Sequence, residues 1–429
     1  MRVAGVDIGS TTVKAVLVED GEVRWQDYER HHTRQAEKAL EFLGRMECEA
    51  GFAPGADRVF FTGSGAGLIA PLVGGRLVQE VVAVAAAVER LHPTVRFVSE
   101  IGGEDMKTIF FTPTDGGNAK QVYMQSACSG GTGTFIEKSA RKLEVSAQAL
   151  ADMPYDGKTL HRISAKCGIF AETDANNLVK AGVQVEEIIA SLFEAVVYQN
   201  LATLAKGNTP MPEVLLLGGP NLFFRGLQQA WRKRLMALWA ERKIPVPGEL
   251  QPEALIRVPD NALYYACLGC VEVAAKEAIA TGRYMGTEAL KWWIEEGQHI
   301  EKAKDGARAL IADEEELARF LERYGAPSAR PATPTSRATG EAVVIGCDFG
   351  STTTKAVVLS TGRELLFSCY TASRGNPMED AKALLRQVRD AGYENIGALA
   401  VTGYGKDLLK DILGADVPVV ETVAHATAA

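Results

Sequence analysis

Hydrophobic and polar positions alternate along this chain with two different periods, and together they predict a mixed α/β fold. The β-branched runs at residues 2–8 and 13–18, followed by GEVRWQDYERH, are typical of a meander of antiparallel strands. Residues 34–51 have helical spacing, RVFFTG reads as a short buried strand, and VVAVAAAVERLH reads as a helix of small residues. VRFVSEIGGEDMKTIFFT then restarts a strand-turn-strand unit, and EVLLLGG is an apolar strand ending in glycines. The pattern predicts an α/β module of two similar halves with a cleft between them.

An internal repeat divides the chain. VAGVDIGSTTVKAVLVEDG at 3–21 returns as VIGCDFGSTTTKAVVLSTG at 344–362, an offset of 341 residues, and the segment at 59–87 returns at 399–429. We therefore expect one complete module followed by part of a second. The expected domains are a complete module at 1–283 with subdomains at about 1–95 and 96–283, a helical segment at 284–324, a Pro/Ala/Ser/Thr-rich linker at 325–342, and the N-terminal subdomain of a second, truncated module at 343–429.

Composition and charge exclude several classes of protein. The chain has 429 residues, of which 47% are hydrophobic, and its formal net charge of −8 provides no basic footprint for nucleic acid or an anionic membrane. Its longest apolar stretch is too short to span a bilayer. Seven cysteines without a visible secretion signal argue against a disulfide framework. These features predict a reducing, cytoplasmic setting in which thiols are free to bind metal.

The first candidate site is the turn DIGSTTVK, between two predicted strands. Gly9 allows the backbone to approach a ligand closely, and the amides and hydroxyls of Ser10, Thr11 and Thr12 are suited to phosphate oxygens. Asp7 is placed to hold Mg²⁺ through water. Lys14 is expected to neutralise phosphate charge. The repeat carries the same loop, with Asp348, Gly350, Ser351, Thr352, Thr353 and Lys355 at the corresponding positions.

Two further glycine turns complete a nucleotide pattern. EIGGEDMK repeats the order acid, glycine pair, acid and lysine, and LLLGGPN provides a turn on which a base or ribose could lie. Two acid-glycine hairpins in successive halves of a module are expected to hold Mg-triphosphate from both sides of the cleft. Glu104 or Asp105 is the candidate for positioning the attacking water. The other predicted ligand-binding residues here are Gly102, Gly103, Lys107, Gly218, Gly219 and Asn221.

Two cysteines directly precede segments with helical character. Cys128 comes before the turn Gly131-Thr132-Gly133, which we expect to open a helix toward the nucleotide, and Cys167 comes before GIFAETDANNLVK. A helix N-terminus favours a thiolate. Their separation of 39 residues fits no zinc-finger spacing, and two thiols are too few for the usual four ligands of an iron–sulfur cluster. From these residues alone, buried structural thiols and metal ligands are both open.

The ordered motifs resemble a known family. GVDIGSTTVKAV, EIGGEDMK, ACSGGTGTFIEK, ISAKCGIFAETD and LLLGGPNLF together resemble the BadF/BadG/BcrA/BcrD ATPases, within the superfamily of actin, hexokinase and Hsp70. The resemblance covers roughly residues 1–275 and again 343–429. It implies an actin-like (ribonuclease H-like) ATPase module of two similar subdomains with a nucleotide cleft, here followed by the first part of a second copy.

The resemblance also implies a function. The family includes the activator (component A) of 2-hydroxyacyl-CoA dehydratases and ATP-binding subunits of benzoyl-CoA reductase. It implies that ATP hydrolysis drives low-potential electron transfer from a [4Fe–4S] cluster shared by two subunits, with Cys128 and Cys167 as ligands in a homodimer or pseudo-dimer. The implied partners are a CoA-ester dehydratase or reductase component, with reduced ferredoxin or flavodoxin as electron donor.

Two other functions remain open, a small-molecule kinase of the same superfamily and a non-catalytic nucleotide-binding regulator. Among the remaining thiols, Cys267 and Cys270 form a C-x₂-C that suits helix packing, with a redox or metal pair as the alternative, and Cys347 is expected in a core. The repeat has His425 where the first copy has Val84. The family commonly has His there, and we interpret Val84 as drift at a packing position.

Overall fold

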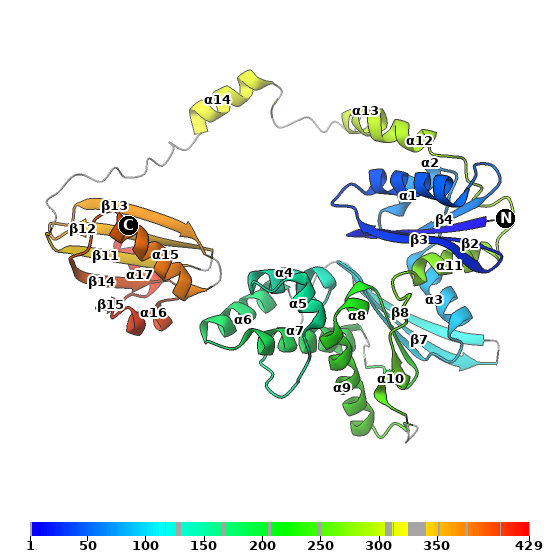
Figure 1. The fold of residues 1–429 in the computed structure, drawn as a ribbon, viewed down its shortest axis with the longest axis horizontal. Helices are drawn as coiled ribbons and strands as arrows, with labels where there is room; N and C mark the ends of the chain where they lie inside the picture. Colours follow the sequence, from blue (N-terminus) through cyan, green and yellow to red (C-terminus); the bar gives the residue numbers. More distant parts are fainter. Residues whose placement is uncertain are drawn as a thin grey trace. The chain divides into compact units, whose positions relative to one another are not determined.

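The computed structural model describes residues 2–115, 117–125, 130–164, 168–204, 207–246, 250–304, 311, 313–324, 340–350, 352–373, 376–403 and 405–428. These residues form three five-stranded sheets with helices packed on them (Figure 1). Contacts within the chain divide it into two units, Met1–Glu172 with Ile189–Ala307 and Thr173–Ile188 with Arg308–Ala429. Cys128, Cys167 and Ser351 lie outside the described residues.

The first sheet is built around the β1–β2 hairpin and has the order β3-β2-β1-β4-β5. β1 is antiparallel to β2 and parallel to β4. Helix α1 packs its apolar face, including Phe42 and Met46, against one side of this sheet, and its C-terminus is capped by Gly51 in the left-handed conformation. The elements are β1 (Arg2–Ile8), β2 (Thr12–Glu19), β3 (Glu22–Arg30), α1 (Gln35–Ala50), β4 (Arg58–Thr62), α2 (Ala66–Leu72), β5 (Arg76–Leu77) and α3 (Glu80–Leu91).

The second sheet repeats this plan, with the order β10-β9-β6-β7-β8. β6 is antiparallel to β7 and parallel to β9. Its strands are β6 (Phe97–Ile101), β7 (Met106–Thr114), β8 (Gly117–Gln125), β9 (Val214–Leu217) and β10 (Ile256–Arg257). The helical elements that follow β8 are α4 (Gly133–Lys142), α5 (Ala147–Asp152), α6 (Gly168–Lys180), α7 (Val185–Gln199), η1 (Asn200–Leu204), α8 (Gly219–Phe223), α9 (Arg225–Glu241), α10 (Pro252–Leu255), α11 (Tyr265–Ala274), α12 (Glu288–Trp292), η2 (Trp293–Gly297), α13 (Gln298–Lys304) and α14 (Glu314–Tyr324).

Helix α11 covers the face of the first sheet opposite α1. A Cβ on Gly5 of β1 would lie 2.1 Å from the Cys267 carbonyl oxygen, and one on Gly269 would lie 1.7 Å from the Ala83 carbonyl oxygen of α3. Glycine at both positions therefore lets α11 approach the sheet and α3 backbone to backbone. Cys267 and Cys270 are fully buried in this packing.

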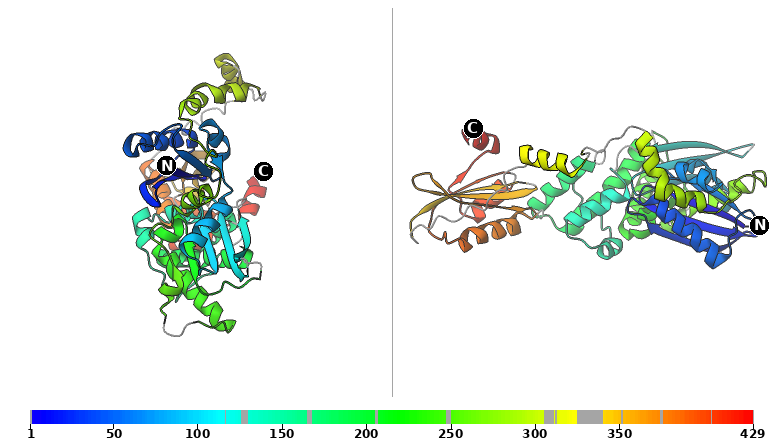
Figure 2. Two further views of the ribbon diagram at one scale, coloured as in Figure 1. Left: turned by 90° about the vertical axis from the view of Figure 1, so that its right-hand side faces the viewer. Right: turned by 90° about the horizontal axis from the view of Figure 1, so that it is seen from above.

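The third sheet has the order β13-β12-β11-β14-β15, with the same parallel and antiparallel pairings as the first. Cys347 is buried in its core, as expected. Helix α15 lies along one face of this sheet, as the right-hand view of Figure 2 shows. The elements are β11 (Val343–Phe349), β12 (Thr353–Ser360), β13 (Leu365–Ala372), α15 (Pro377–Asp390), β14 (Ile396–Thr402), α16 (Lys406–Ile412), β15 (Val417–Pro418) and α17 (Glu421–Ala428).

The predicted α/β architecture is confirmed in its essentials. The expected strands at 2–8 and 13–18 and the expected helix at 34–51 are present within a residue or two of the predicted limits. The domain limits at 283, 324 and 342 stay predictions. In the part of the chain that the structure describes, no helix has both the length and the apolarity needed to cross a bilayer.

Candidate functional site: a cleft between two acid-glycine hairpins

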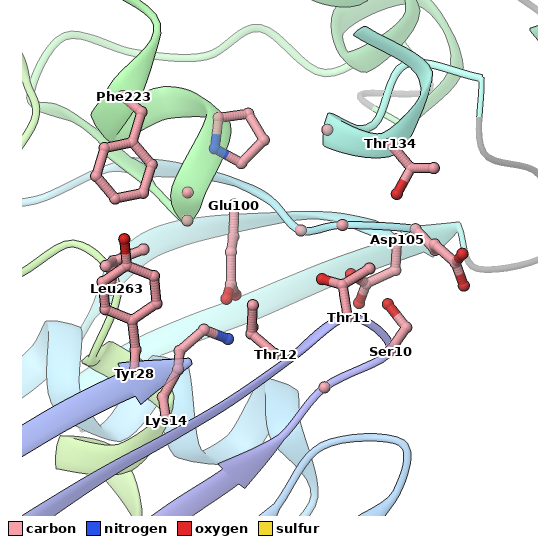
Figure 3. Close-up of a pocket in the computed structure, with 18 of the residues that line it drawn as sticks. Ser10, Thr11, Thr12, Lys14, Tyr28, Glu100, Asp105, Thr134, Phe223 and Leu263 are labelled. Atoms are coloured by element: carbon pink, nitrogen blue, oxygen red, sulfur yellow. The ribbon is translucent and has the colours of Figure 1, made fainter. Parts of the chain in front are cut away.

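The site begins with two hairpins of similar construction. In the β1–β2 hairpin, Asp7 lies opposite Lys14, and in the β6–β7 hairpin, Glu100 lies opposite Lys107. The turns touch, because a Cβ on Gly103 would lie 2.3 Å from the Thr11 Oγ1 atom. Between them lies a cavity of about 580 Å³. Figure 3 shows Lys14 and Glu100 pointing into it from opposite sides.

Most of the predicted nucleotide-binding residues line this cavity. The predicted residues that do so are Asp7, Gly9, Ser10, Thr11, Thr12, Lys14, Gly102, Gly103, Glu104, Asp105, Lys107, Gly133, Gly218 and Gly219. The first turn is closed by a hydrogen bond from the Gly9 amide to the Thr12 carbonyl (3.0 Å). The second is closed by one from the Gly102 amide to the Asp105 carbonyl (2.9 Å).

Three predicted residues do not line the cavity. The Asn221 side chain is buried and donates to the Ser99 and Leu217 carbonyls, while its oxygen accepts from the Trp231 indole. Asn221 therefore holds α8 and α9 against the second sheet. Gly131 is in the left-handed region (φ 83°) beside Gln199, and Thr132 is fully buried.

The first hairpin holds a buried ion pair. Lys14 Nζ lies 2.6 Å from Asp7 Oδ2. Burial lowers the pKa of Lys14, but the Asp7 carboxylate outweighs that effect and leaves it above its ordinary value. The second carboxylate oxygen of Asp7 is buried without a hydrogen-bond partner, as is Oε2 of Glu100. Two buried carboxylate oxygens beside one cavity are suitable acceptors for a metal ion or its water ligands.

Lys107 is the centre of a second charge cluster and is almost fully buried. Its Nζ atom lies 2.7 Å from both Glu80 and Asp105 and 3.8 Å from Glu100. Burial raises the pKa of Glu80 to about 7 although Lys107 opposes the shift, and it raises the pKa of Glu100 for the same reason. The pKa of Lys107 is well above its ordinary value, because the attraction of Glu100, Glu80 and Asp105 outweighs its burial.

The opposite end of the cavity is apolar. Tyr28, Phe223 and Leu263 gather there (Figure 3), and the rings of Tyr28 and Phe223 are 6.0 Å apart between centroids. Gly218 precedes α8 in the left-handed region (φ 86°), where a Cβ would lie 2.1 Å from the Ile101 carbonyl oxygen. A flat, apolar end next to a polar end fits a nucleobase joined to phosphates.

Helix α4 is attached directly to the second hairpin. The Gly133 amide donates to the Gly102 carbonyl (3.0 Å), and the Thr134 amide donates to the Gly103 carbonyl (2.8 Å). On the outer rim, Arg30 of β3 pairs with Glu137 of α4 at 2.6 Å, which joins the two halves across the cavity. A movement of the second hairpin is therefore passed to the N-terminus of α4, five residues after Cys128 in sequence.

Reasoning from the sequence missed several residues of this site. Glu80 comes from α3, far in sequence from either hairpin, and gave no motif signal beyond its match to Glu421. The apolar residues Tyr28, Phe223 and Leu263 were equally invisible. Glu100 could have been found, since it ends a strand before a glycine turn as Asp7 does.

The cysteines outside the cleft have different surroundings. The Cys267 thiol donates to the Lys14 carbonyl (3.4 Å), and burial raises the pKa of Cys267 and Cys270 above the ordinary value. Their burial against β1 and α3 favours the packing interpretation. Among the described residues, no three His, Cys, Asp or Glu side chains form a group able to hold a metal ion. A metal at Asp7 would therefore need ligands from nucleotide phosphates and water.

The repeat reproduces the first hairpin in a more open setting. The Gly350 amide donates to the Thr353 carbonyl (3.1 Å), and Lys355 pairs with Asp348 at 3.0 Å. Asp348 Oδ1 is also buried without a hydrogen-bond partner. In the described residues 340–428, no strand pair corresponds to the β6–β7 hairpin.

Comparison with known proteins gives the context of this cleft. The chain is 28% identical over 228 residues to the activator of lactoyl-CoA dehydratase of Anaerotignum propionicum, covering 51% of this chain and 83% of that protein. It is 28% identical over 260 residues to a protein of Thauera aromatica that is one of the subunits of benzoyl-CoA reductase, covering 58% and 88%.

Among solved structures, component A of the (R)-2-hydroxyglutaryl-CoA dehydratase of Acidaminococcus fermentans aligns with 64% of this chain and 98% of its own, with a TM-score of 0.53 and 23% identity. This confirms the predicted actin-like fold. Residues 4–234, more than half of the chain, match one family of ATPases. This chain belongs to the BadF/BadG/BcrA/BcrD ATPase family.

Proposed function

We propose that this protein is an ATP-hydrolysing activator that drives low-potential electron transfer to a 2-hydroxyacyl-CoA dehydratase or a benzoyl-CoA reductase-like partner. The carrying observation is the cavity between the two hairpins, where buried carboxylate oxygens of Asp7 and Glu100 lack partners. The names of two relatives, one a dehydratase activator and one part of a reductase, support the choice of partner. Reduced ferredoxin or flavodoxin is the proposed electron donor.

In this proposal the cleft binds Mg-ATP in one orientation. The base lies among Tyr28, Phe223 and Leu263, and the phosphates lie between the glycine turns of the two hairpins. Asp7 holds Mg²⁺ through water, and Lys14 offsets charge that develops on the phosphates. Lys107 has three carboxylate neighbours, so it orders the second hairpin as well as adding positive charge.

Glu104 and Asp105 are the candidates for orienting the attacking water. Asp105 is held by Lys107, whereas Glu104 is exposed at the cavity. Asp105→Asn and Glu104→Gln variants separate the two, because loss of a water-positioning group lowers kcat while leaving KM for ATP nearly unchanged.

We further propose that Cys128 and Cys167 of two subunits ligate one [4Fe–4S] cluster. Four thiolates are the usual ligand set, which a symmetric dimer supplies from two cysteines per chain. When bound, the cluster supplies one-electron chemistry at low potential. This chain would couple it to the nucleotide through α4, whose first amides are hydrogen-bonded to Gly102 and Gly103.

Iron and acid-labile sulfide analysis of protein purified without oxygen tests this proposal. We expect about two iron and two sulfide per chain, with an EPR signal after dithionite reduction, and their loss in Cys128→Ala and Cys167→Ala. Cys48→Ala is the matched control, since Cys48 is exposed, and it should keep its iron. Iron-free protein that still hydrolyses ATP would contradict the cluster, and transfer of phosphate to a small molecule would instead indicate a kinase.

A further inference from the structure

The third sheet has one covered face and one open face. Beneath α15 and α16, Ile345, Cys347 and Val358 are buried. Burial alternates along β11 and β12, so every second residue points to the other side. The open face consists of Val344, Gly346, Val357, Leu359, Ala398 and Ala400, none of which is buried. Strand pairing places Gly346 beside both Val357 and Ala400.

The first sheet shows what covers this face in the earlier copy. Val16, the counterpart of Val357, is 0% exposed and packs against Cys267 of α11, whereas Val357 is 39% exposed. Gly5, the counterpart of Gly346, lies directly under the α11 backbone. A Cβ on Gly346 would meet only the neighbouring Val357 side chain, at 3.4 Å. The repeat has therefore kept the glycine that admits a helix, without a helix on it.

A second wall of the same binding groove is also present. In the first copy, α11 packs between the sheet and α3, with Gly269 against Ala83. Helix α17 corresponds to α3, and Ala424 stands where Ala83 stands. None of the residues of α17 that the structure describes is buried, and Val423 is exposed. Sheet and helix thus present both surfaces that enclose α11 in the first copy.

We propose that the open face and α17 bind a helix of the α11 type, carried by a polypeptide segment that supplies the second half of an ATPase module. The open face has six apolar or glycine residues and no charged one, which suits a helix of small residues packed closely. The occupant has Gly, Ala or Cys where α11 has Cys267, Gly269 and Cys270. The α11 helix of another copy of this chain does not qualify, because its own sheet and α3 bury it.

The test is binding of a fluorescent peptide to the full chain, followed by anisotropy. The peptide has the sequence of residues 261–276 with Cys267→Ala and Cys270→Ala, and a second peptide adds Gly269→Leu. We expect the first peptide to bind. Gly346→Leu and Val357→Lys in the protein should each weaken binding about tenfold or more, as should Gly269→Leu in the peptide. Ile412→Lys is the matched control, since Ile412 is exposed on α16, away from the open face, and binding should be unchanged.

Three results would overturn the proposal. One is no binding of the first peptide to the wild-type chain. Another is equal binding to wild type, Gly346→Leu and Val357→Lys when hydrogen exchange shows β11 and β12 folded in all three. A third is a dimer in sedimentation velocity that Val357→Lys dissociates, because a second copy would then cover the open face. Gly346→Ala, which adds one methyl, should still weaken binding if the larger variant disturbs the sheet.

Discussion

The two copies of the Asp-x-Gly-Ser-Thr-Thr-x-Lys hairpin have nearly the same sequence and the same strand register, but they have different surroundings. In both, the aspartate and lysine face each other across the hairpin. The Lys14 side chain is 17% exposed and lies 2.6 Å from Asp7, whereas the Lys355 side chain is 53% exposed and lies 3.0 Å from Asp348. The local motif therefore determines the pair, and the neighbouring elements determine how strongly it is buried.

The difference shows what turns this motif into a site. At the first copy, the β6–β7 hairpin faces the loop, and α11 covers the sheet behind it. Water is thereby excluded around Asp7 and Lys14, which strengthens their interactions with a ligand. The matched pairs of residues in the two copies allow this comparison to be tested by equivalent substitutions.

The largest effect is expected on ATP hydrolysis. Asp7→Asn removes the carboxylate proposed to hold Mg²⁺, so kcat should fall about 100-fold or more. Asp348→Asn should leave phosphate release near the wild-type rate, since the described residues 340–428 contain no hairpin like β6–β7. Inorganic phosphate release by both variants is the measurement. Equal losses in the two variants would show that the second loop takes part in hydrolysis.

A large effect on stability is expected at the paired glycines. Gly5→Val forces side-chain atoms into the α11 backbone and should lower the free energy of unfolding by about 3 kcal/mol. Gly346→Val has open space and should be neutral or slightly stabilising. Tryptophan fluorescence during urea unfolding follows the first module, because residues 340–428 contain no tryptophan, and hydrogen exchange follows the third sheet. Comparable losses at the two sites would mean that Gly346 is covered in solution.

The pH dependence of stability distinguishes Glu80 from its counterpart Glu421. Burial raises the pKa of Glu80 from 4.5 to about 7, so the folded protein binds more protons than the unfolded chain between these values. The free energy of unfolding must therefore fall as the pH rises through this window. Glu80→Gln removes the titrating group, so its stability relative to wild type should increase between about pH 5 and about pH 8.

Glu421→Gln is the control for that measurement, because the Glu421 side chain is 55% exposed. Its stability should keep the pH dependence of the wild type. Urea unfolding at the two pH values compares the variants. A wild-type dependence unchanged by Glu80→Gln would mean that Lys107 keeps Glu80 ionised throughout.

The smallest effect is expected at His425. Its side chain is 77% exposed, so His425→Val should change the free energy of unfolding by no more than about 0.5 kcal/mol. The counterpart Val84 is fully buried among apolar residues, and Val84→His should destabilise the first module by about 2 kcal/mol through burial of a polar ring. Hydrogen exchange of α17 and α3 measures both changes. A marked loss at His425 would indicate that α17 is packed in solution.

Much of the fold followed from local patterns. Strand alternation and helical spacing predicted β1, β2 and α1 closely, because a buried face imposes its period on the sequence. The repeat predicted that two segments 341 residues apart have the same topology, and their sheets have the same strand order. The glycine turns predicted most of the cavity lining, since only glycine allows the approach of Gly103 to Thr11.

The sequence by itself thus determined the elements, the repeat and the chemical character of the two hairpins. The tertiary structure decided which side chains meet. It brought Glu80 to Lys107, turned Asn221 inward to Trp231, and placed α11 on one copy of the hairpin while leaving the other open. These contacts join residues far apart in the chain, and no local period encodes them. Their energies depend on burial, which the same eight-residue motif experiences differently in its two settings.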